Sequence, residues 1–159
     1  MKPICIVALA TVMICISGCG LSEQEKFEAT EKLLSAKYKY IKADYIRVLI
    51  SEGADVNART YAGWTPLMRA AAFSSTPEIV ALLIEKGAEV NAKSTSGWTP
   101  LMVAAGDSST PEIVALLIEK GADALAKDEE GKKAIDHAQE NEKLKGTPAY
   151  WKLHNKSFE

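Results

Sequence analysis

The chain has 159 residues, enough for one ordinary domain or a short array of repeats and too few for a large multidomain enzyme. Apolar residues make up 47% and charged residues 25%, which is close to the globular average and argues against disorder. Nineteen basic and 21 acidic side chains give a net charge of -2, so a nucleic-acid binder, which needs a basic surface, is not expected.

The first 19 residues are typical of an export signal. Lys2 gives a minimal positive start, and residues 4–16 form an apolar run that is too short to cross about 30 Å of hydrocarbon but suits a signal peptide. The run ends in Ile-Ser-Gly-Cys at residues 16–19, which resembles the lipobox of bacterial lipoproteins. This resemblance implies cleavage after residue 18 and diacylglycerol attachment at Cys19. We therefore expect residues 1–18 to be a lipoprotein signal peptide.

The resemblance leaves two alternatives open: an ordinary secretory signal cut at the same place, or an uncleaved anchor whose cysteines are small hydrophobes. Lipidation of Cys19 would leave no cysteine for a disulfide or a metal site, because Cys5 and Cys15 depart with the signal. We then expect a protein held at the bacterial cell envelope by lipid, with the outer membrane facing the periplasm preferred because Gly20 is not an acidic retention residue. Without lipid, the protein is expected to be periplasmic or secreted.

After the cysteine, residues 19–28 are expected to hold the lipidated residue, a short tether and the start of a capping helix. Ser22 and Glu25 match a capping box. Residues 29–62 predict an N-terminal capping repeat with a polar outer face, as a terminal repeat requires. Its first helix is predicted over residues 26–39, with inward side chains Phe27, Leu33 and Leu34.

Two copies of one 34-residue unit follow, at residues 63–96 and 97–130, and 25 of 34 positions are identical. Each copy contains Thr-Pro twice, and threonine as N-cap with proline at the first helical position predicts two short helices per copy. The second helix carries an apolar stripe, and Gly87 or Gly121 follows where a glycine closes a helix. One such helix pair cannot bury its stripe alone, so stacking into a solenoid is expected.

The motif Thr-Pro-Leu-Met-x-Ala-Ala followed by Glu-Ile-Val-x-Leu-Leu-Ile-x-x-Gly-Ala resembles the ankyrin repeat. Tetratricopeptide repeats share the 34-residue period but lack this start and the long finger. Met68 and Met102 stand where the family usually has histidine, so we expect apolar packing of the methionine in place of the polar contact made by the family's histidine. The resemblance implies an all-α fold, an ankyrin-repeat solenoid of about four stacked helix-turn-helix units with hairpin-like fingers.

Residues 131–159 predict a degenerate C-terminal capping repeat. Its first helix continues the pattern through Gly131, Ala134, Ile135 and Ala138, and a last helix begins at Thr147-Pro148 and carries Tyr150, Trp151 and Leu153.

Catalytic and metal-binding patterns are not found in the sequence. His137 and His154 fall in different helices and have no cysteine or paired carboxylate at a ligand spacing, so we expect them to be structural or surface residues. Three consecutive carboxylates at residues 128–130 are more typical of a solvated finger tip than of a calcium site. We expect no enzymatic activity, no metal and no cofactor.

An interaction surface is the remaining candidate. Ankyrin-repeat proteins usually bind partners on the concave face made by finger tips and first helices, which implies a protein partner, of unknown identity, bound here by a monomer. Tyrosine, tryptophan and arginine dominate interface hot spots, but tryptophan before Thr-Pro-Leu can equally be structural. The implied contact positions are Tyr61, Trp64, Arg69, Phe73, Thr95, Trp98, Val103, Asp107, Glu129 and Lys132.

Signal and repeats together predict a membrane-anchored ankyrin-repeat lipoprotein that mediates protein–protein interaction in the bacterial cell envelope. Two alternatives remain open: an immunity protein that neutralises an envelope-acting toxin, and an accessory or protective factor for an envelope enzyme. A toxin gene next to this one would favour the first.

Overall fold

The computed structural model describes residues 21–158, so the predicted signal peptide and Cys19 lie outside the described residues. All regular secondary structure within that range is helical, which confirms the all-α prediction. The helices are α1 (Glu23–Ser35), α2 (Ala43–Ser51), α3 (Pro66–Phe73), α4 (Pro77–Glu85), α5 (Pro100–Asp107), α6 (Pro111–Glu119), α7 (Ala134–Ala138) and α8 (Pro148–Lys156).

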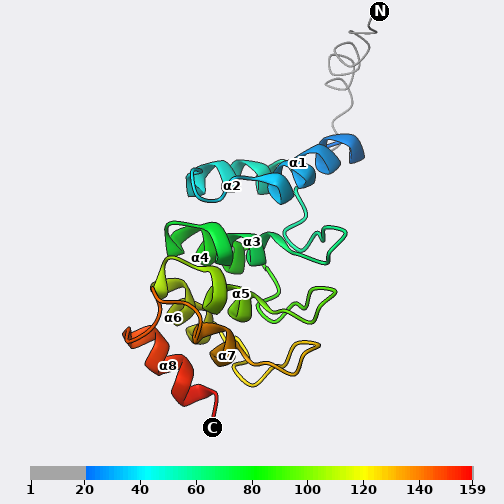
Figure 1. Cartoon of the computed structure of the whole chain (residues 1–159). Helices are drawn as coiled ribbons and strands as arrows, with labels where there is room; N and C mark the ends of the chain where they lie inside the picture. The colour runs from blue at the N-terminus through cyan, green and yellow to red at the C-terminus, as the bar shows by residue number, and fades with distance from the viewer. Residues whose placement is uncertain (1–20, 159) are drawn as a thin grey trace, which may run out of the picture.

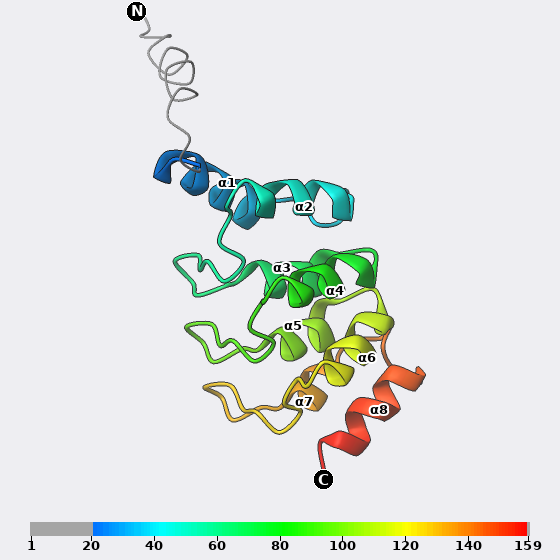
Figure 2. The same cartoon turned by 180° about the vertical axis from the view of Figure 1, so that it is seen from behind.

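Four helix pairs stack into a column with two layers (Figure 1). The first helices pack on one another in the order α1, α3, α5 and α7, and the second helices in the order α2, α4, α6 and α8. Three irregular fingers leave the column on the same side, before α3, α5 and α7, as both views show (Figures 1 and 2). The arrangement is the predicted solenoid, with α1 and α8 at opposite ends.

First helices begin as the sequence predicts. The hydroxyl of Thr65 accepts the backbone N–H of Met68 at 3.3 Å, and Thr99 does the same for Met102. This satisfies one of the free N–H groups at each helix start.

The second helices of the two central repeats begin differently, because the N-cap side chains of Thr76 and Thr110 make no capping hydrogen bond, whereas the Thr147 hydroxyl at the start of α8 accepts the N–H of Tyr150 at 3.2 Å. Instead the hydroxyl of Ser74 accepts the N–H of Thr76 at 3.3 Å and donates to its carbonyl at 2.7 Å. Ser108 makes the same pair of bonds with Thr110. The serine therefore fixes the turn between the two helices of a repeat.

The apolar stripe of the second helices forms the core of the stack together with the buried side of the first helices. Ile79, Val80 and Leu83 are at most 2% exposed, and full burial of each such side chain stabilises the fold by about 1.5–3 kcal/mol. Met68 and Met102 are fully buried, which confirms the expected packing at the positions where the family usually has histidine. The Met102 sulfur also accepts the N–H of Thr99 at 3.4 Å.

In the N-terminal cap, the predicted capping box is confirmed, whereas the predicted helix bounds, residues 26–39, are wrong: the helix begins three residues earlier, at Glu23. Ser22 and Glu25 exchange backbone and side-chain hydrogen bonds at 3.2 and 2.8 Å. The helix ends at Ser35, four residues earlier than predicted.

Phe27 in this cap is 61% exposed, so its predicted inward position is wrong, whereas Leu33 is fully buried and Leu34 half-buried. At 100° per residue, Phe27 points away from the side that buries Ala29 and Leu33. Tyr38 then turns inward and donates its hydroxyl hydrogen to the Leu33 carbonyl at 2.9 Å, which satisfies one free acceptor at the helix end.

At the other end of the stack, Ala134, Ile135 and Ala138 of α7 are buried, and Leu153 anchors α8. Across residues 21–158, the structure holds no helix of the length and apolarity needed to span a membrane.

Candidate partner-binding face

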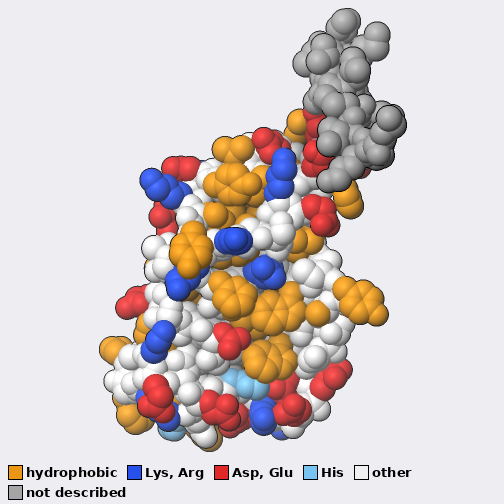
Figure 3. Space-filling model, turned by 45° about the horizontal axis from the view of Figure 1, so that its top comes forward, with side chains coloured by type: hydrophobic (Ala, Val, Ile, Leu, Met, Phe, Trp, Pro, Cys, Tyr) orange, Lys and Arg blue, Asp and Glu red, His pale blue; other side chains and the backbone are white. Residues whose placement is uncertain are grey.

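Three hollows run along the side formed by the first helices and the fingers. They measure about 510, 380 and 200 Å³. Arg69 lines the first two and Asp107 lines the last two, so the hollows join into one feature, which we call the concave groove. Figure 3 shows hydrophobic side chains gathered down the middle of one face, with blue and red side chains around them.

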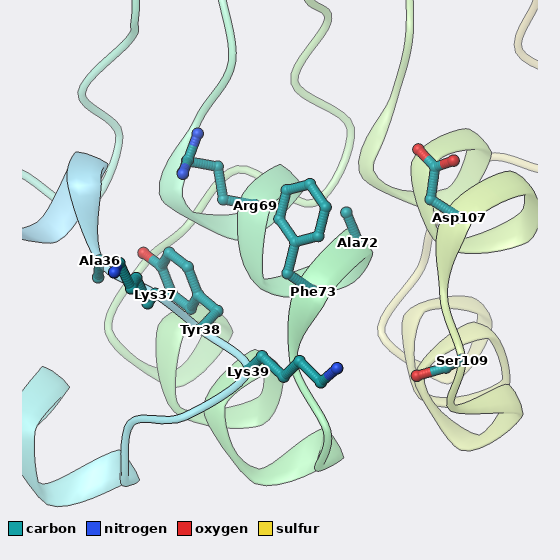
Figure 4. A pocket seen from close by; sticks show the side chains of 9 residues that line it. All are labelled: Ala36, Lys37, Tyr38, Lys39, Arg69, Ala72, Phe73, Asp107 and Ser109. Carbon is teal, nitrogen blue, oxygen red and sulfur yellow. The ribbon is translucent and has the colours of Figure 1, made fainter.

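The middle hollow shows how helix geometry brings distant residues together (Figure 4). Arg69 and Phe73 are four residues apart on α3 and therefore share a face. The Arg69 guanidinium carbon lies 5.9 Å from the Phe73 ring centroid, a distance typical of a cation–π contact. Asp107 comes from α5, and Tyr38 and Lys39 come from the turn after α1.

Arg69 is the most buried of the groove cations that have no counter-ion. Its side chain is half-buried, its Nε is buried without a hydrogen-bond partner, and it forms no ion pair with any residue that the structure describes. Burial raises the pKa of the neighbouring Tyr38 phenol far above its usual range, although the charge on Arg69 acts in the opposite direction. Tyr38 therefore stays protonated and gives Arg69 no negative charge. A buried donor without a partner is costly, and the uncompensated charge of the guanidinium would be stabilised by a carboxylate that a ligand brings to its accessible part.

The two tryptophans have structural contacts and also line the groove. Trp64 and Trp98 are half-buried and pack against a buried cluster that contains Met68, Ala92 and Val103. Each also lines the 200 Å³ hollow. The packing interpretation is therefore confirmed for both side chains, while part of each surface stays open to the groove.

Asp128 and His137 form a buried polar tie under the third finger. The Asp128 side chain is 1% exposed and lies 2.8 Å from His137 Nε2, and it accepts the backbone N–H groups of Glu130 and Lys132 at 2.9 Å. The predicted solvated finger tip is therefore wrong for Asp128, although it holds for the exposed Glu129 and Glu130.

The charge of Asp128 is stabilised despite its burial. Desolvation raises the pKa of Asp128, but the N–H of Lys132, the His137 ring and the N–H of Glu130 together outweigh it and leave the pKa below its usual value. The His137 ring also lies 4.3 Å from Trp98, centroid to centroid. His137 therefore has the structural role that we expected. No cluster of metal-binding side chains occurs in the described part of the chain.

The structure separates the ten predicted contact residues into three groups. Val103 is fully buried, so its prediction as a contact residue is wrong, because this side of α5 faces the tryptophan cluster. Arg69, Trp64 and Trp98 are half-buried. The exposed members are Tyr61, Phe73, Thr95, Asp107, Glu129 and Lys132. Lys37 and Lys39 also line the groove, and we did not predict them because the first repeat lacks a Thr-Pro start to place its turn.

All nine differences between the two copies lie on the first helix or in the finger, and none lies on the second helix. The second helices Pro77–Glu85 and Pro111–Glu119 are identical. The differing pairs are Arg69/Val103, Ala72/Gly106, Phe73/Asp107, Glu89/Asp123, Val90/Ala124, Asn91/Leu125, Ser94/Asp128, Thr95/Glu129 and Ser96/Glu130.

One of these differences has a structural reason within the stack. The Asn57 amide donates to the Gly87 carbonyl, and its oxygen accepts the N–H of Glu89, both at 2.9 Å. Asn91 ties its repeat to the next through Gly121 and Asp123 in the same way. The equivalent third position is Leu125, whose side chain offers no such hydrogen bond. The series of asparagine ties therefore ends where the regular repeats end.

A family model described as ankyrin repeats in three copies matches residues 7–94 and 78–147. The matches together span most of the chain, so this protein belongs to the ankyrin-repeat family. Curated proteins gave no match to the chain. Members of this family are typically non-enzymatic interaction modules, and the repeats imply a protein partner.

Proposed function

We propose that this protein is a lipid-anchored, monomeric ankyrin-repeat protein of the bacterial cell envelope that binds a protein partner in its concave groove. The observation that carries the proposal is the side-chain composition of the groove. Tyr61 is fully exposed on the first finger, Phe73 is 49% exposed, and Arg69 has no counter-ion. Such side chains are the residue types that dominate protein interfaces, and folding alone does not account for their exposure.

The anchor is the second part of the proposal. Cys19 lies three residues before Ser22, whose side chain caps α1. An extended chain spans at most about 3.6 Å per residue, so the folded stack would begin within roughly 11 Å of the lipid. Two acyl chains suffice for stable attachment, because each buried methylene contributes about 0.8 kcal/mol. This geometry favours capture of a partner at the membrane surface, with the periplasmic side of the outer membrane as the preferred site.

The anchor is tested by labelling cells with an alkyne fatty acid and fractionating them. We expect the wild-type protein and Cys15→Ser to carry the label and to sediment with membranes after a carbonate wash. We expect Cys19→Ser to carry no label and to leave the membrane fraction if its signal is still cleaved. Label on Cys19→Ser would contradict lipidation at this residue.

The groove is tested by cross-linking in intact cells followed by purification of the tagged protein. Tyr61→Ala should remove the cross-linked partner, whereas Glu78→Ala on the second helix should not. A partner that is captured equally by both variants would contradict binding in the groove. A captured toxin would identify the protein as an immunity factor, and a captured enzyme would identify it as an accessory factor.

A further inference from the structure

We propose that the concave groove selects an extended polypeptide segment by charge polarity. A carboxylate of this segment would pair with Arg69, an apolar side chain would pack on Phe73, and a basic side chain would lie beside Asp107. This inference rests on the proposed function and specifies the chemistry of the partner.

The cationic end of the groove is built from several side chains without acidic partners. Lys37, Lys39 and Arg69 line the same hollow, and none of them forms an ion pair with a residue that the structure describes. Lys39 Nζ lies 5.6 Å from the Tyr40 ring centroid and the Arg69 guanidinium lies over the Phe73 ring, so both cations are in cation–π contact with an aromatic ring. The planar guanidinium of Arg69 is suited to bind a carboxylate through two parallel hydrogen bonds.

Acidic residues also lie near this end. Asp107 lines the middle hollow itself, and Glu31 lines the adjoining one together with Arg59 and Arg69. Lys39 also lines a further hollow with Asp44 and Glu78, of which Asp44 pairs with Arg47 at 2.9 Å. Arg59 is also engaged with Glu89 at 3.5 Å and with the Lys93 carbonyl at 2.6 Å. Arg69 therefore remains the arginine that is available to a ligand.

The anionic end is one repeat further along the stack. Asp107 lines both the middle and the third hollow, is exposed, and has no hydrogen bond or ion pair within residues 21–158. Glu129 is exposed on the next finger, whereas Glu130 pairs with Lys132 at 2.9 Å. A basic side chain of a partner would find free carboxylates here.

The two copies of the repeat show that folding does not require this polarity. Arg69 stands opposite Val103 in the alignment of the copies, and Phe73 opposite Asp107, while the helices that carry them start and end at equivalent residues. The same helix therefore forms with Arg69 and Phe73 in one copy and with Val103 and Asp107 in the other. The divergence places a cation and a carboxylate along one groove, because Arg69 and Asp107 line the same hollow.

Helix spacing sets the length of segment that fits. Helix α3 packs on α5, and packed helices lie about 8–10 Å apart. An extended chain advances about 3.3–3.6 Å per residue. The acidic and basic residues of the partner should therefore be about three positions apart.

A random dodecapeptide display library tests this inference with the purified full-length protein in detergent. We expect enriched peptides to carry Asp or Glu about three positions from Lys or Arg, with an apolar residue between them. Arg69→Val should remove the preference for the acidic residue and weaken the best wild-type peptide about tenfold or more, the loss expected for a hydrogen bond to a charged group. Asp107→Phe should remove the preference for the basic residue in the same way.

Both substitutions install the residue type found at the equivalent position of the other copy, so the fold should tolerate them, and circular dichroism checks this. Glu85→Gln on α4 is the matched control and should select the wild-type peptides. Enriched peptides without the charge pair, or unchanged selection by Arg69→Val, would overturn the charge inference and leave the proposed function standing. Enrichment of no peptide at all would overturn both.

Discussion

The second helices and the concave groove of the two central repeats have diverged to opposite extents. Across α4 and α6 no residue differs, whereas Arg69 corresponds to Val103 and Phe73 to Asp107 on the first helices. The second helices carry the buried stripe, and the first helices also bury an apolar side that includes Leu67 and Leu101. Most of the positions that differ on the first helices line the hollows, with the buried Val103 as an exception. In the two central repeats, the residues that form the core are therefore largely unchanged, whereas those that line the groove have diverged.

The largest effect should come from the unchanged layer. Leu83→Ala and its equivalent Leu117→Ala each remove a fully buried side chain, so each should lower the free energy of unfolding by about 2–5 kcal/mol. Urea denaturation measures this loss. Glu85→Gln, an exposed change on α4, is the control and should change stability very little. A loss below about 1 kcal/mol at both leucines would contradict the role of the stripe, because even partial relaxation leaves part of the cavity cost.

The next largest effect is a difference in the loss of stability between substitutions at two glycines, Gly63 and Gly87, which both have positive φ. Gly87 has φ 92° and open space at its Cβ position, so Gly87→Ala should cost about 1–2 kcal/mol from the left-handed backbone alone. Gly63 has φ 74°, and a Cβ there would lie 2.8 Å from the backbone nitrogen of Thr95 on the next finger. Gly63→Ala should therefore cost a further 1–3 kcal/mol or so. Thermal unfolding of the two variants measures the difference, and equal losses would show that finger-to-finger contact does not matter.

A smaller effect is expected at the tie under the third finger. Asp128→Ser installs the residue of the equivalent position, Ser94, whose hydroxyl accepts the N–H of Trp98 at 3.2 Å. The serine would keep the equivalent bond from the N–H of Lys132 and lose the bonds to Glu130 and His137, at a cost of about 1–2 kcal/mol.

The same tie predicts how stability depends on pH. The pKa of Asp128 is lower in the folded protein than its usual value of 3.8. The contribution of Asp128 to the free energy of unfolding is therefore complete above the unfolded-state pKa, and it is lost as the pH falls through the lower folded-state pKa. Urea titrations at pH 6 and pH 3 should show that the stability difference between wild type and Asp128→Ser shrinks in acid. A difference that grows in acid would contradict this.

The smallest effect on stability is expected in the groove. Phe73→Asp replaces a half-exposed ring by the residue of the equivalent position and should change the free energy of unfolding by no more than about 0.5 kcal/mol. Urea denaturation beside Leu83→Ala measures both effects on one scale. A loss as large as that of Leu83→Ala would show that this groove-lining position contributes to stability as much as a core position does.

Local signals made most of the fold predictable from the sequence. Thr-Pro marks the start of α3, α4, α5, α6 and α8, and Gly87 and Gly121 close two helices with φ of 92° and 86°. These signals act within a few residues, so they need no knowledge of the tertiary structure. The first repeat lacks Thr-Pro, and there the predicted helix end and the orientation of Phe27 were wrong.

The groove was less predictable because its geometry depends on contacts between repeats. Val103 was assigned to the surface by its position in the repeat, but the half-buried Trp64 and Trp98 enclose it. The sequence predicts that Asp128 is part of an exposed acidic run, whereas in the structure His137, nine residues later, lies 2.8 Å from the Asp128 carboxylate. Arg69 and Phe73 were identified by position, whereas the absence of a counter-ion at Arg69 appears only in three dimensions.

The separation of groove-lining positions from the rest of the surface is tested most directly by photo-cross-linking in living cells. A benzophenone amino acid is placed at Tyr61 on the first finger or at Glu85 on α4, both exposed positions. The account predicts a discrete adduct from position 61, weakened when Arg69→Val is added, and none from position 85. An adduct from position 85 with none from position 61 would contradict it, whereas an adduct from position 61 that persists unchanged with Arg69→Val would contradict the charge inference alone.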